Sequence, residues 1–131
     1  MTYIAIFTNG STKKKREFVE DVAWWFLGEK LPRFKSLNIE IDLVNIEDAD
    51  GTCVELDKRE FHIEIDKSLT GENLLTCILH ELTHVKQHLK NLNGIKEADI
   101  IPYNKRPYEI EAYKEQEILA EEYINKNGIT V

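Results

Sequence analysis

The spacing of apolar residues changes along the chain between two positions and three or four, which predicts a mixture of strands and helices. Thr2 to Thr8 is rich in β-branched and aromatic residues and ends at the turn signal Asn9-Gly10, so it is predicted to be a strand. Ser11 or Thr12 can then cap a helix, which must end before Pro32. Apolar residues at helical spacing predict its core face: Phe18, Val22, Trp25 and Phe26.

Alternation with a period of two predicts further strands in the middle of the chain. From Leu37 to Ile46 apolar residues alternate with polar ones, as in a strand that is buried on one face. The acidic turn Asp48 to Gly51 follows, and Gly51 to Leu56 and Arg59 to Asp66 are predicted to form two strands joined by a short turn. His62 alternates with apolar residues of the second of these strands, so we expect it on the exposed face and not at a metal.

The final part of the chain is predicted to form two helices. Ser68 or Thr70 caps the first, which continues to Asn93-Gly94, where glycine can adopt the left-handed conformation that ends helices. Residues 95–106 are interpreted as a loop, and the second helix extends from Tyr108 to Lys126 behind a proline that suits a first helical turn. This order of elements predicts an α+β fold in which an N-terminal helix packs on a four-stranded mixed sheet.

Length, charge and cysteine usage exclude several classes of protein. The chain of 131 residues fits a single domain, residues 1–131, and its formal net charge is -7. This charge repels phosphate backbones and anionic lipids, and the basic run Lys13 to Arg16 is interpreted as a solvated helix start, so we expect neither nucleic acid nor a membrane as partner. Cys53 and Cys77 lack the spacing of a disulfide framework, and no apolar run suits a signal peptide or a membrane span. A reducing, cytoplasmic location is therefore expected.

The first of the two late helices contains the sequence His80-Glu81-Leu82-Thr83-His84. Residues four apart lie one above the other on a helix, so both histidines can bind one metal ion while Glu81 projects beside them. At about 100° per residue the apolar side chains of this helix share one face, and the histidines lie on the opposite face. The helix is thus predicted to bury one stripe in a core and to present the other to a cleft. The alternative is two histidines on the solvated face of an ordinary helix.

Two histidines leave a catalytic zinc ion short of the three protein ligands that it usually has. His88 lies about 12 Å from His80 along a straight helix, too far for zinc bonds of about 2.1 Å to one ion. The remaining candidates are Glu109 and Glu111, which point about 200° apart on the last helix, so that only one can face the metal. Glu109 shares its side with the stripe by which this helix docks, whereas Glu111 is predicted to belong to an acidic surface in water.

His80-Glu81-x-x-His84 followed by Glu109-x-x-Ala112 resembles the gluzincin group of zinc metallopeptidases. The segment Pro107 to Ala112, Pro-Tyr-Glu-Ile-Glu-Ala, is similar to the third motif of its smallest members, the minigluzincin-like proteins of bacteriophages and bacteria. The resemblance covers about Arg59 to Tyr123. It implies a small zincin-like domain in which His80, His84 and Glu109 hold one Zn²⁺ ion. One departure is Tyr113, because larger gluzincins have an Asp or Asn there that braces a histidine.

The resemblance implies a hydrolase, a metalloendopeptidase that cleaves a protein or peptide by metal-activated water. Zinc lowers the pKa of bound water toward about 7, and Glu81 is placed to accept the proton and to pass it to the leaving amine. Tyr103, Tyr108 or Tyr113 could donate a hydrogen bond to the oxyanion, with aromatic packing as the alternative for each. Cys77 shares the side of the histidines, either as a fourth, thiolate ligand or as a small buried residue under the metal.

A second hypothesis places the chain in another class, a gluzincin-like metal-binding module that is catalytically silent and acts in regulation or protein-protein interaction. Intact His80, Glu81, His84 and Glu109 favour the enzyme, because a module without chemistry has no need of a general base.

Two details around the predicted cleft stay open in the sequence. An extended substrate could pair with a strand beside the cleft, either Gly51 to Leu56 or Arg59 to Asp66, and the sequence does not identify the edge of the sheet. Gln87 is interpreted as a residue that braces the Gly94 loop or bonds to solvent.

Overall fold

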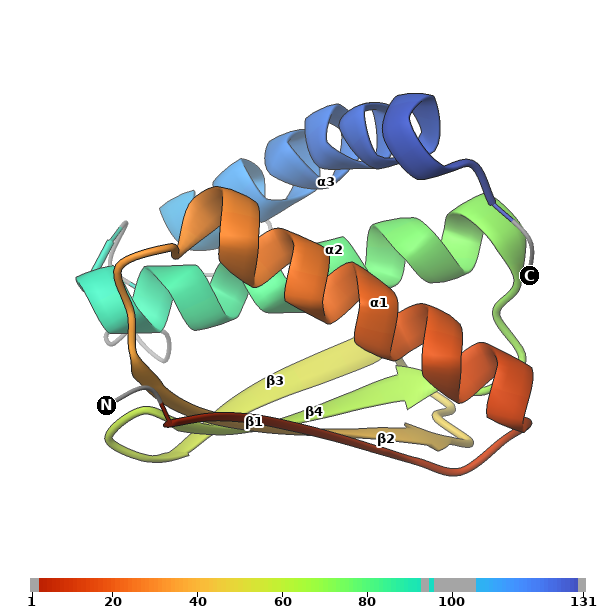
Figure 1. The fold of residues 1–131 in the computed structure, drawn as a ribbon, viewed down its shortest axis with the longest axis horizontal. Helices are drawn as coiled ribbons and strands as arrows, with labels where there is room; N and C mark the ends of the chain where they lie inside the picture. Colours follow the sequence, from red (N-terminus) through yellow and green to blue (C-terminus); the bar gives the residue numbers. More distant parts are fainter. Residues whose placement is uncertain (1–2, 93–94, 96–105, 130–131) are drawn as a thin grey trace.

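The strands and helices follow one another in the order β1, α1, β2, β3, β4, α2, α3 (Figure 1). The computed structural model describes residues 3–92, 95 and 106–129. The strands are β1 (Tyr3–Asn9), β2 (Ser36–Val44), β3 (Gly51–Asp57) and β4 (Glu60–Asp66), and the helices are α1 (Lys13–Lys30), α2 (Gly71–Lys90) and α3 (Pro107–Asn127). Three helices and a four-stranded mixed sheet confirm the predicted α+β class.

The strand order in the sheet is β1-β2-β4-β3. The pairs β1/β2 and β2/β4 are parallel, whereas β3 runs antiparallel to β4. In the described part of the chain, β3 is therefore an edge strand and β4 is internal. The structure thus settles which strand can offer unpaired backbone groups beside α2.

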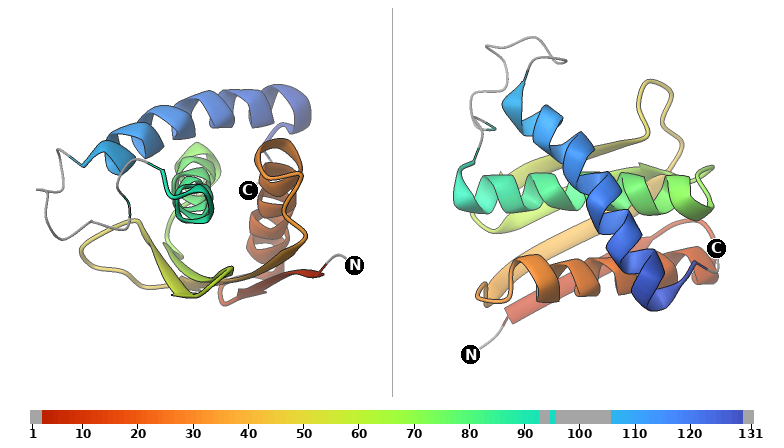
Figure 2. Two further views of the ribbon diagram at one scale, coloured as in Figure 1. Left: turned by 90° about the vertical axis from the view of Figure 1, so that its left-hand side faces the viewer. Right: turned by 90° about the horizontal axis from the view of Figure 1, so that it is seen from above.

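All three helices lie on one face of the sheet (Figures 1 and 2). Helices α1 and α2 cover the sheet, and α3 crosses α2 on the side away from the sheet and reaches α1 (Figure 2). The core lies between the sheet and the two inner helices. Its fully buried side chains include Phe26, Ile39, Ile41, Phe61, Ile63, Ile65, Leu75, Ile78, Leu79 and Leu82. Each such side chain contributes roughly 1.5 to 3 kcal/mol relative to exposure, so this layer dominates the stability of the fold.

The far end of α3 is fixed by aromatic packing on α1. The Tyr123 ring lies edge-on to Phe18 and to Trp25, with ring centroids 6.0 and 5.3 Å apart. Both ring partners of Tyr123, Phe18 and Trp25, were predicted as core positions. This packing anchors the C-terminal half of α3 on α1.

Two predicted helix boundaries have different outcomes. Thr12 caps α1, because its hydroxyl accepts a hydrogen bond of 3.2 Å from the Lys15 amide. Helix α2 ends at Lys90, earlier than predicted, and Asn91 adopts the left-handed conformation with φ of 51°. The predicted stop at Asn93-Gly94 was wrong, because asparagine also tolerates this conformation.

The other boundaries agree closely with the sequence pattern. Strand β2 ends at Val44, two residues before the predicted end, and Pro107 occupies the first turn of α3 as predicted. Thr70, not Ser68, is the N-terminal residue flanking α2, although its side chain makes no capping bond. Most of the predicted loop 95–106 lies outside the described residues. Within the described residues, no helix combines the length and apolar character that crossing a membrane requires.

Candidate metal centre

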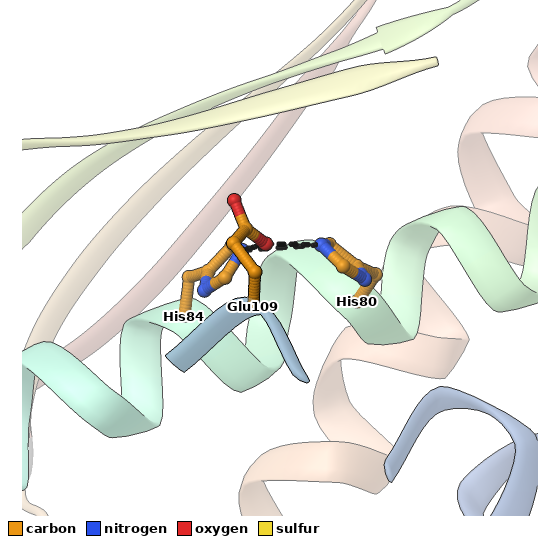
Figure 3. Close-up of side chains that lie close together, drawn as sticks. All are labelled: His80, His84 and Glu109. Carbon is orange, nitrogen blue, oxygen red and sulfur yellow. Dashed lines mark hydrogen bonds and ion pairs between the residues drawn. The ribbon is translucent and has the colours of Figure 1, made fainter. Parts of the chain in front are cut away.

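Helices α2 and α3 bring three side chains together at their crossing (Figure 3). His80 and His84 lie one turn apart on α2, and both side chains point toward Glu109 (Figure 3). Glu109 lies in the first turn of α3, which places its carboxylate between the two imidazole rings. All three side chains are buried, with exposed fractions of 7%, 7% and 8%.

The ligand-capable atoms of this cluster converge within hydrogen-bond distance. Glu109 Oε1 lies 3.0 Å from His80 Nε2 and 2.9 Å from His84 Nε2, and the two Nε2 atoms are 3.1 Å apart. Metal bonds of about 2.0 to 2.1 Å at tetrahedral angles separate ligand atoms by about 3.3 Å, close to these distances. Two imidazoles and a carboxylate suit zinc and several other divalent transition metals. The cluster therefore fits a metal ion without specifying which one.

Without a metal, the same atoms form a buried ion-pair network. Burial alone would raise the pKa of Glu109, but hydrogen bonds from His80 and His84 outweigh it and hold that pKa at about 2. Burial alone would lower the pKa of His84, but its bond to Glu109 and the charge of Glu81 raise it. Since a metal binds unprotonated imidazole, protons and a metal ion compete for this cluster.

Glu81 lies beside the cluster but is not part of it. The group with ligand-capable atoms close together consists of His80, His84 and Glu109. Glu81 is almost completely buried, and this burial raises its pKa to about 6, with Glu109 acting in the same direction and the two histidines opposing it. A carboxyl group with a pKa near neutrality can both accept and release a proton, as a general base requires.

The cluster opens onto a cleft of about 1180 Å³ between edge strand β3 and helices α2 and α3. The β3 side is formed by residues 51–55, and the opposite side by the cluster of His80, His84 and Glu109 with Glu81, and by Tyr108, Tyr113 and Gln116 of α3. This volume exceeds that of a small-molecule pocket, which is typically about 300 to 1,000 Å³. The cleft has room for an extended chain segment along the strand edge.

Amide side chains hold the outer nitrogen of each histidine. His80 Nδ1 lies 2.9 Å from Gln116 Oε1, and His84 Nδ1 lies 2.7 Å from Gln87 Oε1. Gln116 lies two turns after Glu109 on α3, so it provides the brace that is missing at Tyr113. The predicted bond of Gln87 to solvent was wrong, since this side chain is completely buried, and the alternative contact with the Gly94 loop lies outside the described residues. Its position three residues after His84 was the signal that could have identified it.

Glu111 also differs from its predicted role. Its side chain is half-buried, and its Oε1 accepts a hydrogen bond of 2.8 Å from Gln87 Nε2. The prediction of a carboxylate in water assumed that α3 contacts α2 along a single stripe. The long Gln87 side chain reaches beyond that stripe, so Glu109 and Glu111 both face partners on α2.

The tyrosines differ in their access to the cleft. Tyr113 is 51% exposed, lines the cleft and lies with its ring 4.6 Å from the His80 ring. Tyr108 is buried against His84, and its hydroxyl accepts a hydrogen bond of 3.1 Å from Arg106. Tyr103 lies outside the described residues. Of the two candidate oxyanion donors that the structure describes, Tyr113 has the greater access to the cleft.

Cys77 and His88 both border the cleft but lie outside the cluster of His80, His84 and Glu109. Burial raises the pKa of the Cys77 thiol, and the charges of Glu81, Asp50 and Asp66 raise it further. A protonated thiol is a poor ligand, which favours the role of a small buried residue. His88 Nδ1 lies 3.8 Å from Glu55 Oε1, as expected for a histidine too far along the helix to join the cluster.

A second group of candidate ligands lies on the face of the sheet away from the helices. It consists of Glu40, Asp42 and His62, with His62 Nε2 2.8 Å from Asp42 Oδ2 and 3.8 Å from Glu40 Oε1. Glu40 is exposed and the other two side chains are half-buried. A partly exposed ion pair accounts for this arrangement, in line with the predicted placement of His62 on the outer face.

Gly51 allows β3 to approach α2 closely. A Cβ atom at this position would lie 2.9 Å from Cys77 Sγ and 3.1 Å from both Glu81 Cγ and the Glu64 carbonyl oxygen. We therefore expect Gly51→Ala to lower the free energy of unfolding by roughly 1 to 3 kcal/mol, as overpacking does. Urea unfolding measures the change. Adding Cys77→Ala to this variant should recover part of the loss, since it removes the nearest atom.

Gly28→Ala is the matched control for this substitution. A Cβ atom at Gly28 meets nothing within 4 Å, and the residue lies inside α1. This variant should gain about 0.4 to 1 kcal/mol. A Gly51→Ala protein as stable as the wild type would contradict the close approach of β3 to Glu81.

In comparisons with protein-family models, with curated proteins and with solved structures, no match to this chain was found.

Proposed function

We propose that this chain is a zinc-dependent metallopeptidase of the gluzincin type. His80, His84 and Glu109 are the proposed ligands of one Zn²⁺ ion, and Glu81 is the proposed general base. The observation that carries the proposal is the convergence of three ligand atoms within 3.1 Å at a cleft, next to a buried carboxylic acid. Two neutral imidazoles and one carboxylate leave a bound zinc ion with a net charge near +1 and an open position.

Bound zinc would supply Lewis acidity and lower the pKa of a water molecule to about 7. Glu81 would accept a proton from that water as it attacks the peptide carbonyl, and would then donate the proton to the leaving amine. Its burial supports this role, because a raised pKa matches a group that must bind and release a proton near neutral pH. Tyr113 is the proposed hydrogen-bond donor to the oxyanion.

The proposed substrate is an extended peptide segment. Edge strand β3 borders the cleft, and residues 51–55 line it, so a peptide can add to the sheet through backbone hydrogen bonds. Such pairing would lay the scissile bond between β3 and the histidines of α2. Backbone pairing carries little information about side chains, so selectivity would depend on the cleft residues.

One observation favours the alternative of a catalytically silent module. The three cluster side chains satisfy one another as ion pairs, which makes the cluster self-consistent as a buried polar network. A module of this kind would retain His80, His84 and Glu109 while making no use of Glu81. The test of the proposed function must therefore separate metal binding from hydrolysis.

The test measures the metal content of the purified protein and its hydrolysis of a casein-like substrate before and after chelation. We expect about one zinc ion per chain, loss of hydrolysis with the chelator, and recovery on adding zinc. Zinc at 100 times its dissociation constant should also stabilise the fold by about 2.7 kcal/mol and raise the melting temperature by several degrees, because it ties α3 to α2.

Three outcomes of this test are distinct. Hydrolysis that persists after complete metal removal would contradict a metallopeptidase. Zinc binding without hydrolysis of any peptide would favour the module. A melting temperature that is unchanged by zinc, in protein shown to be metal-free at the start, would reduce the cluster to an ion-pair network.

A further inference from the structure

We infer that Gln87 and Glu111 act together as a positioning pair that fixes the His84 ring with its Nε2 lone pair toward the metal. The inference rests on the proposed metal binding and adds two residues to its support. It gives α3 two roles at the site: a direct one through Glu109, and an indirect one through Glu111. The bonds of the pair end on His84 Nδ1 and on the Gln87 amide, not on the three atoms that converge at the proposed metal site.

The direction of the Gln87 amide follows from its partners. Its Nε2 lies 2.8 Å from the Tyr108 carbonyl oxygen and 2.8 Å from Glu111 Oε1. A carbonyl oxygen and a carboxylate oxygen both accept hydrogen bonds, so the amide nitrogen must face them. The amide oxygen is then the atom that faces His84. The opposite orientation would place the two acceptors, the Tyr108 carbonyl and the Glu111 carboxylate, against the Gln87 amide oxygen.

The direction of the amide determines the tautomer of His84. Gln87 Oε1 is 2.7 Å from His84 Nδ1, and an oxygen acceptor requires a proton on that nitrogen. His84 Nε2 lies 2.9 Å from Glu109 Oε1, to which it donates, and 3.1 Å from His80 Nε2, so it is the nitrogen whose lone pair a metal ion would bind in place of that proton. Outer partners of this kind typically change metal affinity by about 10- to 100-fold when they are removed.

Gln116 provides an internal comparison on the other histidine. Its Oε1 also faces a ring nitrogen, His80 Nδ1, but its Nε2 bonds at 3.1 Å to the exposed neighbour Glu117. Gln116 is only half-buried, whereas Gln87 is fully buried and held by two acceptors. The constraint on His84 is therefore the stronger one, and removing Gln87 should have the larger effect.

The test compares zinc affinities of variants by competition with a chromophoric chelator. Gln87→Met keeps the length of the side chain and removes its hydrogen bonds, and we expect it to weaken zinc binding by about 10- to 100-fold. Glu111→Ala leaves the Tyr108 carbonyl to hold the amide, so a smaller loss is expected. Glu111→Gln still offers an acceptor oxygen to Gln87 and should bind zinc within about threefold of the wild type.

Thr83→Val is the matched control. Thr83 is buried on the same helix, and its hydroxyl donates to the Leu79 carbonyl of that helix at 2.8 Å. It should bind zinc within about threefold of the wild type, whatever its melting temperature. This control separates a loss of helix stability from a loss of ring orientation.

A second readout follows the His84 ring directly. In the zinc-loaded wild type with ¹⁵N-labelled histidine, NMR should detect a proton on His84 Nδ1 that exchanges slowly with water. The Gln87→Met variant should lose this protection, because no acceptor replaces the amide oxygen. If that variant does not fold, the zinc affinity of Glu111→Ala and the NMR signal of the wild-type His84 Nδ1 proton provide the test.

Two results would overturn the positioning pair while leaving the proposed function intact. One is zinc affinity in Gln87→Met equal to that of Thr83→Val. The other is a zinc-loaded wild type in which His84 binds through Nδ1 or has an unprotected Nδ1 proton. A wild-type chain that binds no zinc would instead overturn the proposed function and the inference with it.

Discussion

The Glu81→Gln variant is expected to lose hydrolysis by a factor of about 10² to 10⁴ while it retains zinc. The amide has nearly the same size as the carboxylate but cannot accept the proton of the attacking water. Glu81 lies outside the cluster of His80, His84 and Glu109, so removing its charge leaves the proposed ligand set intact. Peptide hydrolysis and zinc content, measured on the same preparation, check both parts of the expectation.

Glu122→Gln is the matched control for the loss of Glu81. Glu122 is exposed on α3, and its substitution changes the net charge of the chain by the same amount. It should hydrolyse peptides at the wild-type rate. If Glu81→Gln keeps a biological activity of the wild type in full, the catalytically silent module becomes the better account.

Glu109→Ala is expected to weaken zinc binding by about a hundredfold or more. Structural zinc sites bind with about 10 to 16 kcal/mol over four ligands, so one ligand corresponds to roughly 3 kcal/mol. The substitution also leaves His80 and His84 without the carboxylate that lies within 3.0 Å of both. Zinc titration under buffered conditions measures the change, with Glu122→Ala as an exposed control on the same helix.

The comparison with Glu111 makes this prediction specific to one carboxylate. Glu111 reaches the site through Gln87 and not through the cluster, so Glu111→Ala should weaken zinc binding much less than Glu109→Ala. A larger loss in Glu111→Ala would mean that the ligand roles on α3 are reversed. Equal losses would indicate that the substitutions act by loosening the first turn of α3.

The strands and helices could be predicted because their signals are local. Alternation from Leu37 to Leu43 and from Phe61 to Ile65 follows directly from the period of a strand, and these side chains are buried as expected. Thr12 and Pro107 mark helix starts by chemistry that acts within one turn. The end of α2 was missed because Asn91 and Gly94 can both adopt the left-handed conformation, and local sequence does not rank them.

The candidate site likewise has features that local sequence predicts and features that only the packing of the elements fixes. The pairing of His80 with His84 needs only the pitch of one helix, and the register of the last helix placed Glu109 on the docking side. The close approach of Gly51 to Cys77 and Glu81 depends instead on β3 lying at the edge of the sheet beside α2. Strand order is a property of the whole sheet, so no local pattern contains it.

The sequence by itself determined the elements, the face of α2 that carries the histidines, and the carboxylate of α3 that meets them. Only the tertiary structure decided that β3 is the edge strand beside α2, that Gln87 and Gln116 contact the histidines, and that Glu111 bonds to Gln87. The contacts between α3 and α2 join residues 21 to 36 positions apart, through long side chains whose reach depends on how the helices cross. Helical periodicity specifies the directions of side chains around one helix axis, whereas these contacts also depend on the distance and the angle between the axes of α2 and α3.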